Sequence, residues 1–506
     1  MLGPGLRIAI GGGLALISLP YWLARVVVGL RTRIFTRING AEGIVIPGEL
    51  VDAAHFKEVY AHPAANGRSR GAALSDLFWY WLSPGAEIHQ EHLEPGPRYE
   101  EVARTTRRIL ALPQQEAERL AARCVSRVLD ERDIRRPTTV RLRDLMMPVW
   151  ADFYYEVVFG ERCPPQAREL IVGNANDVVT ALKFSSLRHM DARLRLTAFL
   201  TERLQHRPPP HRLPSGLSIR EQALYLQGTF FNTAVVQMSE AMAHLLLVLA
   251  QQPDAQGRVA ADPGQDRYLD HVIAETQRLY PLFGIAHRIT SADIEVDTRT
   301  VIPAGSVLCF NYPAFHRAGF DHPDRFDPDR WETLSVRTAN HIPFGVTANR
   351  PCPARGLAPV TMRVATREML ARFVLRSSAA HTRSIPNRGP CLLQPRPHPA
   401  DLDVVAGDAP GGEATTIMAR LLGSLRSSLR CDAHSPVAFA TSRSAGIRGA
   451  LFAMRVRDCW EDVWRSVVQL VLGSYMVWDA RRQRLCARHF EPPDGFAQAE
   501  PTSGRR

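Results

Sequence analysis

One cysteine of this chain stands out because of the residues around it. Cys352 lies in PFGVTANRPCPARG (343–356), a loop sequence rich in glycine and proline that precedes an apolar segment with helical spacing. The eight cysteines (124, 163, 309, 352, 391, 431, 459 and 486) show no CxxC or CxxxxC spacing. This distribution argues against a zinc ribbon, an iron–sulfur cluster and a disulfide framework, and it favours reduced structural thiols. The flanks of Cys352 set it apart from the other seven.

A charged pair precedes this loop in the sequence. Glu275 and Arg278 lie three positions apart in a segment with helical spacing (267–280), so they share one helical face and can form an ion pair. Alone, such a pair is typical of any helical surface. Its context is more specific, because a meander rich in proline and arginine, FDHPDRFDPDRW (320–331), follows and contains Arg330.

The order of these motifs resembles that of the cytochrome P450 family. A helix with Glu-x-x-Arg, strands, a Phe-x-Pro-x-Arg-Trp meander and a Phe–Gly loop with one cysteine follow one another over roughly residues 40–396. The resemblance implies a haem b cofactor with Cys352 as the axial thiolate ligand of the iron. A thiolate pushes electron density onto iron and favours O–O cleavage. It also implies that Glu275, Arg278 and Arg330 form a buried charge triad that pins the meander to the helix.

The resemblance implies further residues around the haem. Arg288 and Arg350 match family arginines that bind the propionates, a use that suits a forked donor. His316, in PAFHRAG, matches a histidine at a propionate or the haem edge, with simple packing as the alternative. Arg107, in RTTRRIL, matches a propionate-binding arginine, with Arg104 as the alternative register and surface solvation as the alternative for both.

The cysteine loop departs from the family pattern in two places. Seven residues, rather than six, separate Phe344 from Cys352, and Ala354 stands where a second glycine is usual. The additional residue can be absorbed as a bulge, and an alanine requires that its position avoid positive φ. We therefore expect a variant loop that still binds haem, with Phe344 against the cofactor. The alternative is a relative without haem in which Cys352 is inert.

The long helix opposite the loop departs from the family as well. The family carries an acid followed by threonine, and counting back from LAQQP places these positions at Val236 and Gln237. The polar residues within a turn are Asn232, Thr233, Ser239 and Glu240. Gln237 or Ser239 could hold a water that relays protons, with Gln237 and Thr233 as the candidate catalytic residues. A substrate hydroxyl is another route, and mere packing over the haem is the alternative.

The elements that must position these residues are mostly helical. The periodicity predicts a mostly α (α+β) protein of cytochrome P450-like fold with small sheets. Helices are expected over 51–60, 99–129, 143–160, 166–180, 190–205, 219–250, 267–280 and 357–374, with strands within 38–50, 294–312 and 384–396. The segment 219–250 is apolar nearly all round, so it should be buried.

Three regions are expected along the chain. Residues 1–37 form an apolar stretch (8–30) followed by Arg31, Arg33 and Arg37, which is typical of a membrane anchor whose C-terminal side is cytoplasmic. Pro20 and Arg25 favour the alternative of an amphipathic or buried helix. Residues 38–396 form the haem domain, and 397–506 form a C-terminal extension of unknown role.

The charge of the chain bears on its partners. The formal net charge is +11, and it is carried almost wholly by scattered arginines, since only Lys57 and Lys183 are lysines. This spread argues against nucleic acid but permits docking to an acidic protein or an anionic membrane. The last hundred residues show no dinucleotide fingerprint. We therefore expect a separate redox partner of ferredoxin or reductase type, received by Arg350, Arg355 and Arg363.

The expected function is that of a cytoplasmic, membrane-associated haem-thiolate monooxygenase. It would hydroxylate or epoxidise a small apolar organic substrate with O2. The alternatives are a haem-thiolate enzyme that uses peroxide or catalyses a rearrangement, and a non-catalytic haem-binding protein. The expected pocket lining comprises residues of 70–95 and 283–286 together with Phe230, Phe231, Ala234, Gln237 and Met238.

Overall fold

The structure is a computed structural model of the 506-residue chain. It describes residues 32–66, 88–183, 189–261, 266–385 and 387–396, except for 42 and 336, and a few single positions outside these ranges (26, 28–30, 75, 82 and 264). The predicted anchor and the predicted C-terminal extension lie outside the described residues, apart from a few positions near 26–37.

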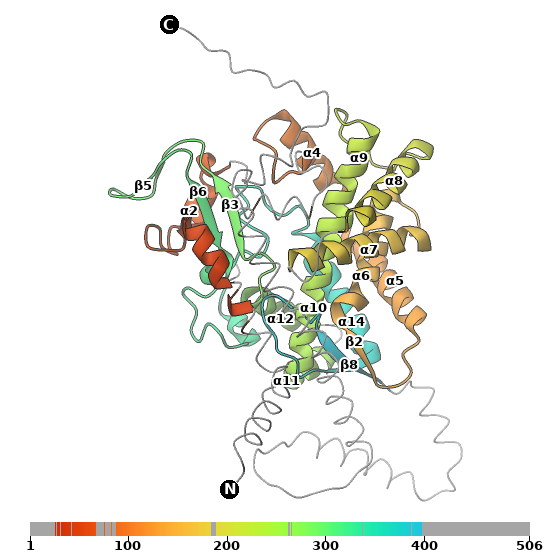
Figure 1. The fold of residues 1–506 in the computed structure, drawn as a ribbon. Coiled ribbons are helices and arrows are strands. Elements are labelled where there is room, and N and C mark those ends of the chain that lie inside the picture. Colours follow the sequence, from red (N-terminus) through yellow and green to blue (C-terminus); the bar gives the residue numbers. More distant parts are fainter. Residues whose placement is uncertain are drawn as a thin grey trace, which may run out of the picture.

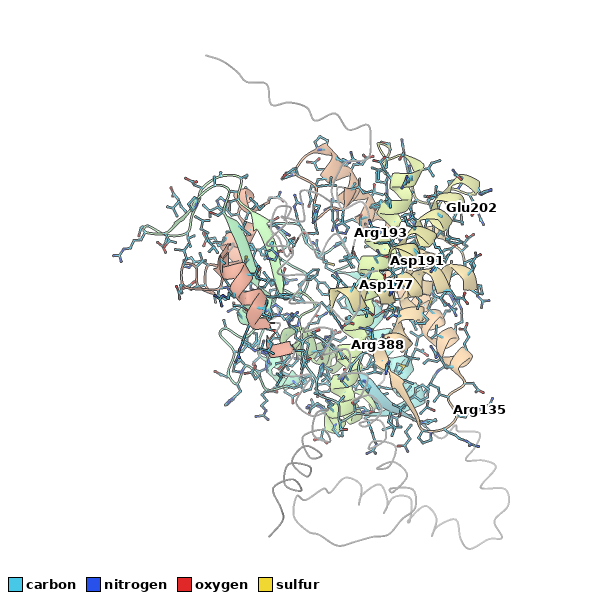
Figure 2. The ribbon with its side chains drawn as sticks, viewed as in Figure 1. Arg135, Asp177, Asp191, Arg193, Glu202 and Arg388 are labelled. Carbon is cyan, nitrogen blue, oxygen red and sulfur yellow. The ribbon has the colours of Figure 1, made fainter. Side chains whose placement is uncertain are left out.

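A layer of helices forms one side of the molecule. It contains α5 (Gln114–Arg132), α6 (Leu142–Phe159), α7 (Pro165–Leu182) and α8 (Met190–His206), whereas α4 (Pro97–Ile109) lies apart from them at the top of the view in Figure 1. The helices α12 (Asp266–Leu279) and α14 (Leu357–Arg372) pack near the base of the same core. Figure 2 shows charged side chains of α8, including Asp191 and Glu202, and both are exposed. The mostly helical fold expected from the sequence is confirmed.

Three small sheets complete the fold. The strands β1 (Ile44–Ile46), β6 (Val307–Asn311) and β3 (Ile285–Ile289) form a mixed sheet in the order β1-β6-β3. This sheet packs with α2 (Phe56–Ala61) on the side opposite the helical layer (Figure 1). The second sheet joins β2 (Thr138–Arg141), β8 (Pro390–Pro395) and β7 (Phe373–Arg376), and the third pairs β4 (Ile294–Glu295) with β5 (Val301–Ile302).

A long helical rod runs between these two sides. A capping box at Ser218 and Glu221 begins α9 (Ile219–Leu226), which continues through a π-helical segment, η3 (Gln227–Ala234), into α10 (Val235–Gln251). Among the described residues, Ile219–Gln251 is the one helix long and apolar enough to cross a membrane, but 83% of its most apolar window is buried in protein. The expected buried helix is therefore present, and the π-helical segment within it was not predicted.

Two helix boundaries differ from expectation, and in both cases proline is the reason. The expected helix 99–129 is two helices, because Pro113 stands at the N-cap of α5 and separates it from α4. No helix was listed between the expected helices 219–250 and 267–280, yet Pro253 begins α11 (Pro253–Ala261) there. Proline is well accommodated at the first position of a helix, where its missing N–H has no partner to lose.

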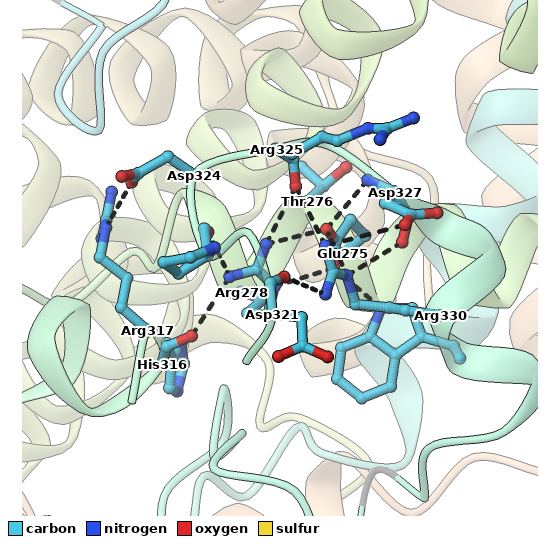
Figure 3. Close-up of polar contacts among 12 residues, drawn as sticks. Glu275, Thr276, Arg278, His316, Arg317, Asp321, Asp324, Arg325, Asp327 and Arg330 are labelled. Atoms are coloured by element: carbon cyan, nitrogen blue, oxygen red, sulfur yellow. Dashed lines mark hydrogen bonds and ion pairs between the residues drawn. The ribbon is translucent and has the colours of Figure 1, made fainter. Parts of the chain in front are cut away.

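A buried carboxylate joins α12 to the meander. Glu275 accepts hydrogen bonds from Nε and Nη2 of Arg278 (2.9 and 2.8 Å) and from Nε of Arg330 (3.1 Å), as Figure 3 shows. The indole N–H of Trp331 and the backbone N–H of Asp327 also donate to it, each at 3.0 Å. Glu275 and Arg278 are fully buried, so this cluster holds the meander by charge in a region without solvent.

We predict that Glu275→Gln lowers the free energy of unfolding by about 3–5 kcal/mol, because it leaves two buried guanidinium groups without their counter-charge. Urea denaturation followed by circular dichroism would measure this loss. The control is Asp329→Asn, which removes an ion pair with Arg258 in which both side chains are about half exposed. We expect less than about 1 kcal/mol for that variant. Equal losses in the two variants would contradict the prediction.

Candidate functional site

A cavity of about 740 Å³ is lined by residues of β3 on one side and by residues of α6, α7 and the rod on the other. Its walls include Cys352 and Phe344 from the loop 343–356, residues 285–288 of β3, and residues of the rod from Thr229 to His244. This size is within the range of about 300–1,000 Å³ that is usual for cofactor and ligand sites. Cys352, within the described part of the chain, faces this cavity.

The loop that carries Cys352 is closed by a backbone hydrogen bond. The N–H of Cys352 donates to the carbonyl of Phe344 at 2.9 Å. Two residues between them have positive φ, Gly345 (74°) and Arg350 (47°), so the backbone turns back on itself within seven residues. Ala354 is not among the described residues of positive φ, which is the condition that an alanine there was expected to meet. The longer loop thus remains compact.

The thiol of Cys352 is enclosed by protein. Burial raises its pKa to about 11, while a hydrogen bond from the backbone of Ala354 and the positive charge of Arg355 act in the opposite direction. These two influences favour the thiolate form. A bound metal cation deprotonates a coordinating thiol outright, so burial does not prevent this sulfur from acting as a ligand.

Two buried arginines line the same cavity as Cys352. Arg288 of β3 is 4% exposed and donates to Glu91 (3.0 Å) and to the carbonyl of His287 (2.9 Å). Its Nε is buried and has no hydrogen-bond partner in the described part of the chain. Arg350 donates to Asn66 Oδ1 (2.8 Å) and to the carbonyls of residues 90 and 66. Burial lowers the pKa of Arg350, and the charge of Arg288 lowers it further, so the two cations are close together.

Two residues that were expected at the cofactor lie elsewhere. Arg107 and its alternative, Arg104, are exposed on α4, because the buried face of that helix is formed by Val102, Thr106 and Ile109. Neither arginine lines the cavity. Both are solvated on the surface, which was the alternative stated for them.

His316 is buried but does not line the cavity either. Its Nε2 accepts the N–H of Ile342 at 3.0 Å, two residues before Phe344, and its carbonyl accepts from Arg278 at 3.3 Å. The position of His316 thus agrees with the alternative role, packing within the fold, rather than with contact to the haem. It connects the charge cluster of Glu275 to the beginning of the cysteine loop.

Of the distal candidates, two line the cavity. Gln237 and Thr233 both face it, and the hydroxyl of Thr233 donates to the carbonyl of Gly228 at 2.7 Å. This bond reaches back five residues, as the π-helical spacing of η3 allows. Ser239, the alternative relay residue, is fully buried, donates to the carbonyl of Val235 and does not line the cavity.

One polar cluster of the cavity wall was not predicted. Glu240 accepts hydrogen bonds from Lys183 (2.7 Å to each carboxylate oxygen) and from Arg143 (3.1 Å). Burial alone would raise the pKa of Glu240, but the two cations reverse this effect and hold the pKa below its usual value. The partners lie 57 and 97 residues away in the sequence, so no local pattern signals the cluster.

The rest of the predicted lining is largely found. Phe230, Ala234 and Met238 line the cavity, as do Ser75, Leu82 and residues of 88–91 and 283–286. Phe231 does not, and it packs against Tyr155 and Phe159 instead. Of the three arginines expected to receive a redox partner, Arg350 is buried and Arg363 pairs with Asp266 at 2.9 Å, so only Arg355 is exposed.

These residues fit a haem. The cavity joins a single thiol, an apolar helical wall and two buried cations at one edge, one of which has an orphaned N–H. A haem needs an axial ligand, apolar walls and donors for two propionates, and forked arginine donors suit those carboxylates. Cys352 would hold the iron, Phe344 would pack on the macrocycle, and Arg288 and Arg350 would bind the propionates.

Comparisons with known proteins identify the family. Residues 193–400 match the family model "Cytochrome P450". The mycobacterial protein cytochrome P450 135B1 (Mycobacterium tuberculosis) is 31% identical over 185 residues, which are 34% of this chain and 39% of that protein. A cyclooctat-9-en-7-ol 5-monooxygenase of Streptomyces melanosporofaciens is 30% identical over 24% of this chain and 30% of its own length. The chain thus matches about two fifths or less of the length of these relatives.

The solved structures agree on the fold. A zebrafish cytochrome P450 with progesterone superposes with a TM-score of 0.53 and 17% identity, covering 68% of this chain and 90% of that one. The family model covers residues 193–400, and the helical fold and the order of motifs agree with it, so this part of the chain is assigned to the cytochrome P450 family, whose cofactor is haem b. The predicted family and cofactor are thereby confirmed.

We predict that Glu240→Gln destabilises the protein by about 3–5 kcal/mol at pH 7, because it leaves Lys183 and Arg143 buried without an anion. The folded pKa of Glu240 is lowered, so its contribution is fully present above the unfolded value of about 4.5 and is lost as the pH falls through the folded pKa. Urea denaturation at pH 7 and at about pH 4 should therefore show a deficit that shrinks on acidification.

The control is Asp191→Asn, which removes an exposed pair with Arg195 in the outer helical layer (Figure 2). It should change stability by less than about 1 kcal/mol at either pH. A deficit of Glu240→Gln that stays constant with pH would contradict the assignment of the effect to the charge.

Proposed function

We propose that this chain is a haem-thiolate monooxygenase that hydroxylates or epoxidises a small organic substrate, with O2 and with electrons from a separate redox partner. The observation that carries the proposal is one cavity that joins the Cys352 thiol, the Arg288–Arg350 edge and the apolar rod, in a chain of the cytochrome P450 family. When bound, haem supplies the oxidation chemistry, and its thiolate ligand favours O–O cleavage.

The residues of the chain divide the remaining tasks. Cys352 binds the iron, and the backbone of its loop directs a hydrogen bond to the sulfur. Arg288 and Arg350 bind the propionates and fix the orientation of the cofactor. Phe230, Val236 and Met238 exclude water from the cavity and hold the apolar part of a substrate. The curated relative from Streptomyces is named as a monooxygenase, which supports this class of reaction.

Proton delivery is the step in which this chain differs from the family pattern. Val236 and Gln237 stand at the positions of the acid and the alcohol, and both line the cavity. The Gln237 amide can orient a water but has no proton to give at neutral pH. This observation favours a second candidate, a haem-thiolate enzyme that uses peroxide or rearranges its substrate.

The test is the spectrum of the reduced protein with carbon monoxide. We predict the long-wavelength Soret band of a thiolate ligand in the wild type and its loss in Cys352→Ala, because Cys352 would supply the thiolate that holds the iron. Cys391→Ala is the matched control, since Cys391 is buried in β8 and does not line the cavity. Absence of this band in the wild-type protein would contradict the proposal.

Turnover separates the two candidates. Product formed with a reduced ferredoxin and its reductase under air supports the monooxygenase. Product formed with peroxide alone, or without any oxidant, supports the second candidate. No product under any condition, with the thiolate band present, would leave a haem-binding protein that does not catalyse.

We further propose that the protein associates with a membrane through residues 8–30 and faces the cytoplasm. Deleting residues 1–34 should move the protein from the membrane fraction to the soluble fraction, because the apolar stretch is removed together with Arg31 and Arg33. Haem content, measured by absorbance, should be unchanged. A full-length protein that is already soluble would refute the anchor.

A further inference from the structure

One arginine of the cavity has no counter-charge in the described part of the chain. Arg383 lies in the loop 377–389 between β7 and β8 and lines the same cavity as Cys352. Burial lowers the pKa of its guanidinium group, and the one described charge that adds to this effect is the like charge of Arg317. Arginine stays protonated in proteins, so Arg383 is a cation on the cavity wall that is only partly exposed.

The buried arginines show how unusual this is. Arg143 pairs with Glu240, Arg278 with Glu275 and Arg288 with Glu91. Arg350 has no ion pair but donates to the carbonyls of residues 66 and 90. Arg317, the neighbour of Arg383, is itself paired with Asp324 at 2.8 Å. A buried charge is costly unless it is paired, so an unmatched arginine on a cavity wall indicates an anion that arrives with a ligand.

The position of the Arg383 guanidinium group depends on the absence of a side chain at Gly284. A Cβ built on Gly284 would lie 2.9 Å from Nη2 and 3.0 Å from Cζ of Arg383. The guanidinium group therefore rests directly on the backbone that leads into β3. Any larger residue at 284 would displace it, which makes Gly284 part of the arrangement.

The loop is held firmly behind Arg383. His381 and His244 of α10 share a hydrogen bond of 2.8 Å, and the ring of Tyr280 stacks on His381 at 3.7 Å. Lys183 donates to the carbonyl of Ile385 at 3.0 Å. A binding group fixed in advance loses little conformational entropy when the ligand arrives.

The two histidines do not share the charge of Arg383. Burial lowers the pKa of His244 to about 3 and that of His381 to about 2, so both rings are neutral at pH 7. The backbone of Arg383 forms a hydrogen bond with His244, which leaves Nδ1 of His244 to accept the N–H of His381. Nδ1 of His381, which has no partner among the described residues, is then a bare acceptor rather than an orphaned donor.

We propose that Arg383 binds the carboxylate of the substrate, so that the substrate is an organic acid with an apolar body. A guanidinium group offers two parallel N–H donors that match a carboxylate. Phe230, Val236 and Met238, on the rod, provide the apolar surface for the body of the same ligand. The proposal rests on the function proposed above and narrows its substrate class from an apolar molecule to an amphiphilic acid.

The test compares acids with their methyl esters on the purified holoprotein. The probes are laurate and the diterpene acid abietate, and calorimetry gives the dissociation constant of each acid and each ester. Because hydrogen bonds to a charged group are involved, we expect the wild type to bind at least one acid about tenfold to a hundredfold more tightly than its ester. Arg383→Gln should abolish that preference while leaving the ester within about twofold. Arg383→Lys, which keeps the charge but not the fork, should restore part of it.

The matched control is Arg135→Gln, an arginine that is 83% exposed at the edge of the molecule, far from the cavity (Figure 2). It should leave both constants unchanged. The proposal is overturned if the wild type prefers neither acid, if Arg383→Gln keeps the preference, or if inorganic phosphate binds at Arg383 and neither acid displaces it. The carbon monoxide spectrum of each variant is recorded in parallel. If the wild type shows the thiolate band but no preference for an acid, only the proposal for Arg383 is contradicted. If the wild type lacks the band, the proposed function itself is contradicted.

Discussion

The Glu275 carboxylate is the contact through which the cysteine loop is tied to the helical core. Its two oxygens accept five hydrogen bonds: two from one edge of the Arg278 guanidinium group, and one each from Arg330, from Trp331 and from a backbone N–H. Arg278 passes this restraint on to the carbonyl of His316, and the ring of His316 accepts the N–H of Ile342. A chain of hydrogen bonds, charge-assisted at Glu275 and Arg278, therefore runs from α12 to the beginning of the loop that carries Cys352. A carboxylate without solvent can hold such a network only while every donor is present, which makes the arrangement rigid.

The order of motifs was readable from the sequence because each motif is local. Glu275 and Arg278 are neighbours on one helical turn, and the loop from Phe344 to Cys352 closes on itself, so spacing alone describes both. Arg107 shows what spacing could also have excluded, since the period of Val102, Thr106 and Ile109 turns it to the solvent. Glu240 lies at the other extreme. Its partners come from α6 and from the end of α7, and only the folded chain brings them together.

The π-helical segment marks the limit of reading a long helix by periodicity. Residues 227–234 were expected to continue an α-helix, and their side chains are as apolar as those of the neighbouring turns. The wider spacing of the π-helical segment leaves a carbonyl open to a side chain, and the hydroxyl of Thr233 donates a hydrogen bond to the carbonyl of Gly228. Thr233 therefore faces the cavity with its hydroxyl already committed to the backbone. Gln237, in the first turn of α10, is left as the polar side chain at the expected position of the alcohol.

The charges inside the cavity follow one rule with one exception. Arginine cannot shed its proton, so each buried guanidinium group must find an anion or several carbonyls within reach. Arg288 has Glu91, and Arg350 has the carbonyls of residues 66 and 90, so the edge assigned to the propionates is stable before they bind. Arg383 has neither among the described residues, and its neighbour Arg317 adds a like charge. Gly284 and His381 keep the charge of Arg383 in place although an unpaired charge lowers the stability of the fold. Such a loss of stability is typical of a binding site rather than of a core.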